Sequence, residues 1–118
     1  MSNPRLVILE SPYAADDPAA LARNIAYARA CLADSLRRGE APLASHLLYT
    51  QPGVLDDKKP DERRMGIEAG LAWGAHAEAS VFYMDLGISG GMRLGLERAM
   101  REGRAVEMRR LEGEWCVE

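Results

Sequence analysis

The sequence predicts an α/β fold: a single three-layer, Rossmann-like domain in which a parallel sheet of four to five strands carries helices on both faces. Its 118 residues are the length of one domain, and 47% of them are hydrophobic, which is enough for a core. Short apolar segments alternate with longer segments of helical periodicity, an order typical of right-handed crossovers between parallel strands. We therefore expect residues 1–118 to form one domain.

The first expected strand and helix follow one another closely. Residues 6–9 (Leu-Val-Ile-Leu) form a continuous apolar run, which suits a strand buried on both faces of a sheet. Asp17 and Pro18 then supply an N-cap and a proline for the first helical turn. Apolar residues recur at helical spacing until Gly39, which follows two arginines and is expected to end the helix.

The middle of the chain predicts a second strand, a loop and a helix. Ala41 to Leu48 is the expected strand, with Pro42 at its beginning because proline cannot donate to a central ladder. Residues 50–60 are expected to be a loop. A helix from Asp61 to Ala75 should follow, and its three glycines weaken it intrinsically but permit close packing.

The last third predicts one more crossover. Residues 79–84 are expected to form the third strand, and Ser89 is the expected cap of a helix that Gly103 ends. Residues 104–108 are predicted as the fourth strand, and residues 112–117 as a fifth strand or a tail.

Polar side chains gather where the first three strands are expected to end. Ligands of open parallel sheets bind beyond the carboxyl ends of the strands, so these side chains are candidates for a binding site. A plain turn after the first strand and a structural role for the lone histidine remain alternatives. The candidate ligand-binding residues are Glu10, Ser11, Tyr13, His46, Tyr49, Asp85, Ser89, Gly90, Gly91 and Met92.

The most informative stretch runs from Asp85 to Met92 and contains the turn Ser89-Gly90-Gly91. A glycine-rich turn that leads into a helix N-terminus presents backbone N–H groups to an anion, so a phosphate or a carboxylate is the expected ligand group. The spacing is neither the Walker pattern nor the dinucleotide fingerprint, and many tight turns look similar.

Metal ions, other cofactors and several classes of partner are not expected. His46 and His76 lie in separate elements, and Cys31 and Cys116 are far apart, which favours reduced structural thiols. The net charge of −3 comes from mixed signs, which disfavours duplex nucleic acid. The sequence contains neither a signal peptide nor an apolar run approaching about 20 residues, so we expect a soluble, cytoplasmic protein without a membrane partner.

A set of motifs from Leu6 to Val106 resembles the small, phage-associated branch of the nucleoside 2-deoxyribosyltransferase-like family. The order of the motifs along the chain carries the resemblance more than any one of them. They are Ser11-Pro12-Tyr13, Asn24, Ser45-His46-Leu47, Leu55-Asp56-Asp57, Glu62-Arg63 and Ile88-Ser89-Gly90-Gly91-Met92.

This resemblance implies a reaction mechanism, but the chain departs from the family at the residue that would carry it. In catalytic members, a glutamate on the helix after the serine-glycine turn attacks the sugar carbon of an N-glycosidic bond, and the base leaves. That glutamate is expected six residues after Ser89, where this chain has Gly95. Glu97, the candidate catalytic residue, stands two residues further on, which rotates it by about 200° around a helix. A smaller departure is Ser45, where the family usually has proline.

Three functions are compatible with the sequence. The favoured hypothesis is a module that binds a nucleoside, nucleotide or related ribosyl ligand without cleaving it. The alternative is an N-glycosidic bond hydrolase or deoxyribosyltransferase that uses Glu97, Glu68 or Glu10, and a third is an assembly protein without a ligand. The resemblance also implies a homodimer or larger assembly, with exposed Trp73 or Met92 among the contacts.

Overall fold

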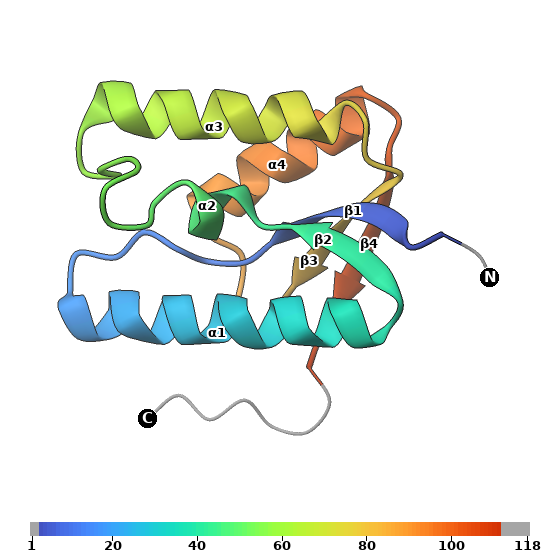
Figure 1. Cartoon of the computed structure of the whole chain (residues 1–118), viewed down its shortest axis with the longest axis horizontal. Helices are drawn as coiled ribbons and strands as arrows, with labels where there is room; N and C mark the ends of the chain where they lie inside the picture. Colours follow the sequence, from blue (N-terminus) through green and yellow to red (C-terminus); the bar gives the residue numbers. More distant parts are fainter. Residues whose placement is uncertain (1–2, 112–118) are drawn as a thin grey trace.

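A computed structural model describes residues 3–111 and contains one four-stranded sheet with all strands parallel, in the order β2-β1-β3-β4 (Figure 1). The predicted fold class is confirmed, because helices cover both faces of this sheet. Both the expected segment 112–117 and Cys116 lie outside the described residues. The strands are β1 (Arg5–Glu10), β2 (Glu40–Leu43), β3 (Ala79–Tyr83) and β4 (Ala105–Arg109).

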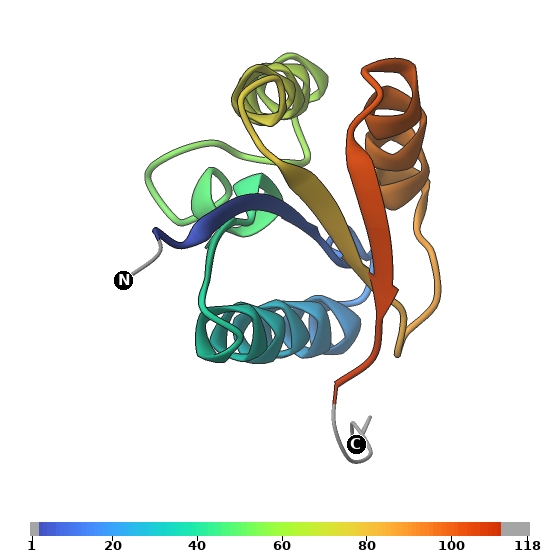
Figure 2. The same cartoon turned by 90° about the vertical axis from the view of Figure 1, so that its right-hand side faces the viewer.

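The helices divide between the two faces of the sheet. Helix α1 (Pro18–Arg37) lies along one face, and α3 (Pro60–Gly74) and α4 (Gly90–Arg101) lie along the other (Figure 2). A short helix, α2 (Ser45–Leu48), follows the edge strand β2. Within the described residues, no helix combines the length and the apolar character that a membrane crossing requires.

The predicted helix ends are confirmed by their capping interactions. The Asp17 side chain accepts a hydrogen bond from the Ala19 amide at 3.2 Å, which fixes the start of α1. Gly39 follows α1 with a φ of +86°, a conformation that glycine adopts without strain. The Ser89 hydroxyl accepts a hydrogen bond from the Met92 amide at 3.2 Å, which fixes the start of α4.

The alternation of side chains along β1 separates the core from the site. Val7 and Leu9 belong to the buried cluster that includes Tyr27 and Cys31 of α1. Because successive side chains of a strand point to opposite faces, Ile8 and Glu10 lie on the side of α3 and α4. The end of β1 therefore places a carboxyl group on a face that the core does not fill.

The predicted second strand is wrong in its second half. Strand β2 stops at Leu43, and Ser45–Leu48 is helical, with hydrogen bonds from the Leu48 amide to the Ala44 carbonyl at 2.9 Å and from the Tyr49 amide to the Ser45 carbonyl at 3.0 Å. Periodicity in a segment as short as residues 41–48 does not distinguish a strand from a strand followed by a helical turn, which explains the error.

Pro42 is the third of the four residues of β2 rather than its first. The sheet tolerates this position because β2 is an edge strand with one side free of ladder partners.

A buried ion pair joins the two edge strands, β4 and β2, to each other. The Arg109 guanidinium donates to both carboxylate oxygens of Glu40, at 2.7 and 2.6 Å. Ser35 of α1 donates to the same carboxylate at 2.8 Å. The hydrogen bond from Arg109 has the largest effect, and together these hydrogen bonds lower the pKa of Glu40 to about 2. The pair therefore stays charged across the physiological range.

Close packing of α3 depends on its glycines, as the sequence predicts. A Cβ atom on Gly70 would overlap the Ser45 hydroxyl of α2 and lie 2.8 Å from the Ser45 Cβ. A Cβ on Gly66 would lie 3.2 Å from a methyl carbon of Leu55. Helix α3 thus approaches α2 more closely than any larger residue at position 70 would allow.

We predict that Gly70→Ala lowers the free energy of unfolding by about 1–3 kcal/mol, because α2 must move to admit the new methyl group. Urea denaturation measures this change. Gly91→Ala in α4 is the control, because its Cβ would meet only the Ser89 hydroxyl at 4.0 Å. An equal loss in both variants would contradict the close approach of α2 and α3.

Candidate functional site

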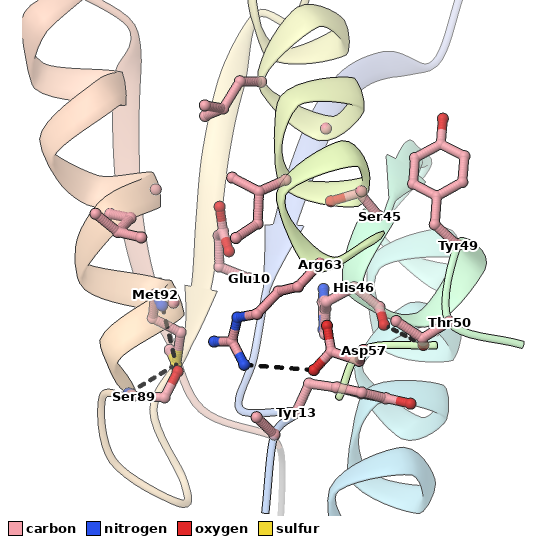
Figure 3. Close-up of a pocket in the computed structure, with 18 of the residues that line it drawn as sticks. Glu10, Tyr13, Ser45, His46, Tyr49, Thr50, Asp57, Arg63, Ser89 and Met92 are labelled. Carbon is pink, nitrogen blue, oxygen red and sulfur yellow. Dashed lines mark hydrogen bonds and ion pairs between the residues drawn. The ribbon is translucent and has the colours of Figure 1, made fainter. Parts of the chain in front are cut away.

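A pocket of about 450 Å³ opens on the side of the sheet that carries α3 and α4 (Figure 3). Its walls are the end of β1, helix α2, the glycine-bearing face of α3 and the N-terminal half of α4. The strand order reverses between β1 and β3, and in open parallel sheets this switch point is where ligands bind.

Nine of the ten candidate ligand-binding residues line this pocket. Asp85 is the one that does not. It accepts a hydrogen bond from the Tyr27 hydroxyl at 2.6 Å and others from the Leu111 amide, and so joins β3 to α1 and to the segment after β4. The residues that do line it are Glu10, Ser11, Tyr13, His46, Tyr49, Ser89, Gly90, Gly91 and Met92.

Ser11, Tyr13 and His46 form one polar wall of the pocket. The Ser11 hydroxyl lies 2.8 Å from His46 Nε2, and the Tyr13 ring meets the imidazole edge-on with 6.3 Å between centroids. Burial lowers the pKa of His46 to about 4, so the imidazole is neutral at pH 7 and has one donor and one acceptor nitrogen. The helical turn of α2, which the sequence did not predict, carries this histidine to the end of β1.

Glu10 is the last residue of β1 and contributes the carboxyl group of the pocket. Burial raises the pKa of Glu10 to about 8, and the positive charge of Arg104 offsets this effect only in part. The carboxyl therefore carries a proton at pH 7. A protonated carboxyl can donate one hydrogen bond, which an ionised one cannot.

The N-terminus of α4 forms the opposite wall. Ser89 uses its hydroxyl to cap the helix, and the backbone of Gly90 and Gly91 lines the pocket. First-turn N–H groups of a helix have no intrahelical partner and favour an anion. Met92 is buried, with 1% of its surface exposed, so the expectation that it is exposed for contact with another subunit is wrong.

Tyr49 and Trp73 join α3 to the segment after α2. The indole Nε1 of Trp73 donates to the Tyr49 hydroxyl at 2.8 Å, which turns that phenol away from the pocket. The Trp73 side chain stays 56% exposed.

Several pocket residues were not predicted as ligand contacts. Arg63 of α3 extends toward Asp57, and the two form a loose ion pair with 3.5 Å between nitrogen and oxygen (Figure 3). Arg104 reaches the pocket from the turn before β4. The pair Glu62-Arg63 stood among the family-like motifs and could have been proposed, whereas nothing in the local sequence distinguishes Arg104 from a surface arginine.

Of the three glutamates considered as catalytic groups, only Glu10 lines the pocket. Glu97 and Glu68 are exposed on α4 and α3. The position of Glu97 agrees with the rotation of about 200° that separates it from Gly95 on a helix, and Gly95 itself lines the pocket. Among residues 3–111, no group of three or more His, Cys, Asp or Glu side chains is arranged to hold a metal ion.

The fold and the site define a Rossmann-like α/β domain with a polar pocket at the switch point of its sheet. Residues 5–109 match the model of a family described as a domain of unknown function (DUF7768), and the chain belongs to that family. A comparison with curated proteins gave no match.

Proposed function

We propose that this domain binds a nucleoside, nucleotide or related ribosyl compound in the pocket between β1, α3 and α4. The observation that carries the proposal is the convergence of Glu10, the Ser11–His46 pair and the N-terminus of α4 on one cavity. A volume of about 450 Å³ lies within the range of small-molecule sites. The resemblance seen in the sequence supports the same ligand class.

The two ends of the pocket suit the two ends of such a ligand. The amides of Gly90 and Gly91 at the N-terminus of α4 provide positive potential for a phosphate or another anion. Ser11, Tyr13 and the neutral His46 provide hydroxyl and imidazole groups for an uncharged sugar or base. Nucleotides of this kind are abundant in the cytoplasm, where we expect the protein to act.

A second candidate function is hydrolysis of an N-glycosidic bond, and the protonated carboxyl of Glu10 favours it. In this reaction water adds to the anomeric carbon, and the bond to the base breaks with its electron pair leaving on the base. Glu10 gives its proton to the base, and the proton released by the water restores the carboxyl. A carboxyl with a raised pKa suits this general-acid role.

We also propose that the protein assembles as a dimer or larger oligomer through the exposed Trp73. Large exposed aromatic side chains are enriched in interfaces. The mass measured by light scattering should exceed that of one chain and fall in Trp73→Ser. A monomeric mass at every concentration would contradict this assembly.

For the binding function, we predict that Gly90→Leu weakens the binding of a nucleoside 5′-monophosphate at least about tenfold, because the side chain enters the anion end of the pocket. Isothermal titration calorimetry measures the affinity. The melting temperature should change little, since a Cβ on Gly90 has no neighbour within 4 Å. Glu97→Leu on the exposed side of α4 is the control, and undiminished binding by Gly90→Leu would move the anion site elsewhere.

For the hydrolytic candidate, we predict that chromatography detects free base after incubation with nucleosides and nucleotides, and that Glu10→Gln loses at least about a hundredfold in rate. Glu97→Gln should keep the wild-type rate, because its side chain is outside the pocket. Loss in Glu97→Gln with retention in Glu10→Gln would reverse the roles of the two residues. Binding without any base release would leave the domain a binding module.

A further inference from the structure

The Glu10 carboxyl and Gly95 occupy complementary positions. A Cβ atom on Gly95 would overlap a carboxylate oxygen of Glu10 and lie 2.7 Å from its carboxyl carbon. Any larger residue at position 95 would therefore force Glu10 out of its observed position. Strand β1 and helix α4 have room for one side chain between them here, and the strand supplies it.

No hydrogen bond or ion pair joins the carboxyl of Glu10 to another residue between 3 and 111, and its partly buried side chain lies in the wall of the pocket. Polar groups of folded proteins that lack a partner in the protein form hydrogen bonds with water, or with a ligand that displaces the water. Glu10 lines the pocket, so a molecule bound there can take the place of water as the hydrogen-bond partner of this carboxyl.

The cation whose charge acts on Glu10, Arg104, already donates hydrogen bonds to other acceptors. The Arg104 guanidinium donates to the Ser80 hydroxyl at 2.9 Å, to the Gly74 carbonyl at 2.6 Å and to Glu102 at 2.5 Å. It lowers the pKa of Glu10 through its charge, but less than burial raises it. Arg104 therefore acts on Glu10 through its charge and forms no ion pair with it.

Other ionisable groups of the pocket do not neutralise Glu10 either. From α2, His46 is uncharged at neutral pH. From α3 and the loop before it, Arg63 pairs with Asp57, and Glu62 accepts a hydrogen bond from the Asp56 amide at 2.9 Å. The residues with which α4 lines the pocket carry no ionisable side chain.

We propose that Glu10 binds the ligand as an uncharged carboxylic acid and donates a hydrogen bond to an uncharged acceptor, such as a base carbonyl, a ring nitrogen or a sugar oxygen. This inference rests on the proposed function and adds the chemical group of the ligand that the site recognises. The part of the ligand opposite Glu10 presents an acceptor, while any anionic part lies at the N-terminus of α4.

Binding should then require the proton on Glu10 and weaken as pH rises through about 8. Adenosine, cytidine and their 5′-monophosphates are suitable probes, because their bases do not titrate between about pH 7 and 9.5, and a phosphate has lost most of its second proton by pH 7. Calorimetric affinities at these two pH values should fall about tenfold or more for the wild type and for the exposed control Glu97→Gln. Glu10→Gln keeps a donor but cannot ionise, so its affinity should change less than about twofold.

A ligand-free measurement tests the protonation of Glu10 by itself. With a folded pKa of about 8, above the ordinary 4.5, the carboxyl stabilises the fold fully below pH 4.5, and this contribution is lost as pH rises to 8. The stability of the wild type relative to Glu10→Gln should therefore fall across that window. Parallel stability curves would overturn the inference, whatever the ligand.

The binding outcomes separate the inference from the proposed function. Wild-type binding that is equal at both pH values, or equally pH-dependent in Glu10→Gln, would overturn the role of Glu10 and leave nucleoside binding in place. If none of the four probes binds at either pH, the proposed function is wrong and the role of Glu10 toward such ligands is wrong with it. An affinity that falls with pH in the wild type and in Glu97→Gln, but not in Glu10→Gln, would support both the proposed function and the role of Glu10.

Discussion

The reversal of strand order between β1 and β3 is the constraint on which the site depends. After β1 the chain crosses to α1 on one face of the sheet, and after β3 it crosses to α4 on the other. The segments that follow these two neighbouring strands therefore diverge and leave a crevice between them. Helix α3 closes the third side, and it can lie close to α2 only because Gly70 has no side chain that would displace Ser45.

The element that carries a carboxyl decides its protonation state. A glutamate in the first turns of a helix lies in the positive potential of the helix N-terminus, which favours the anion. A glutamate at the end of a central strand that loses water contact and has no hydrogen-bond donor in the protein is favoured as the neutral acid. Glu10 is of the second kind, and Gly95 leaves it the space. A side chain at position 95 of α4 and the Glu10 side chain of β1 would thus compete for the same space.

The sequence predicted correctly those features that depend on interactions between residues close together in the chain. Caps at Asp17 and Ser89 and the apolar run of β1 placed α1, α4 and the centre of the sheet correctly. Prediction failed where tertiary contacts decide. Residues 45–48, predicted as the end of a strand, form the helical turn that carries His46, and Asp85 accepts a hydrogen bond from Tyr27 instead of lining the pocket. The site was predicted as a set of residues at strand ends, but the pairing of Glu10 with Gly95 joins positions too distant in sequence for any periodicity to reveal.

The two ends of the pocket are also linked electrostatically. An anion at the N-terminus of α4 places negative charge in the same cavity as Glu10, and a like charge favours the protonated form of a carboxyl. Binding of the proposed anion would therefore raise the affinity of Glu10 for its proton, and by thermodynamic reciprocity the proton on Glu10 would raise the affinity for the anion. A neutral Glu10 removes the repulsion that an ionised carboxylate would exert on a phosphate, so a buried acid and an anion site are compatible in one small pocket. The absence of a side chain at Gly95 then serves both, since it admits the acid and keeps α4 free of a competing carboxylate.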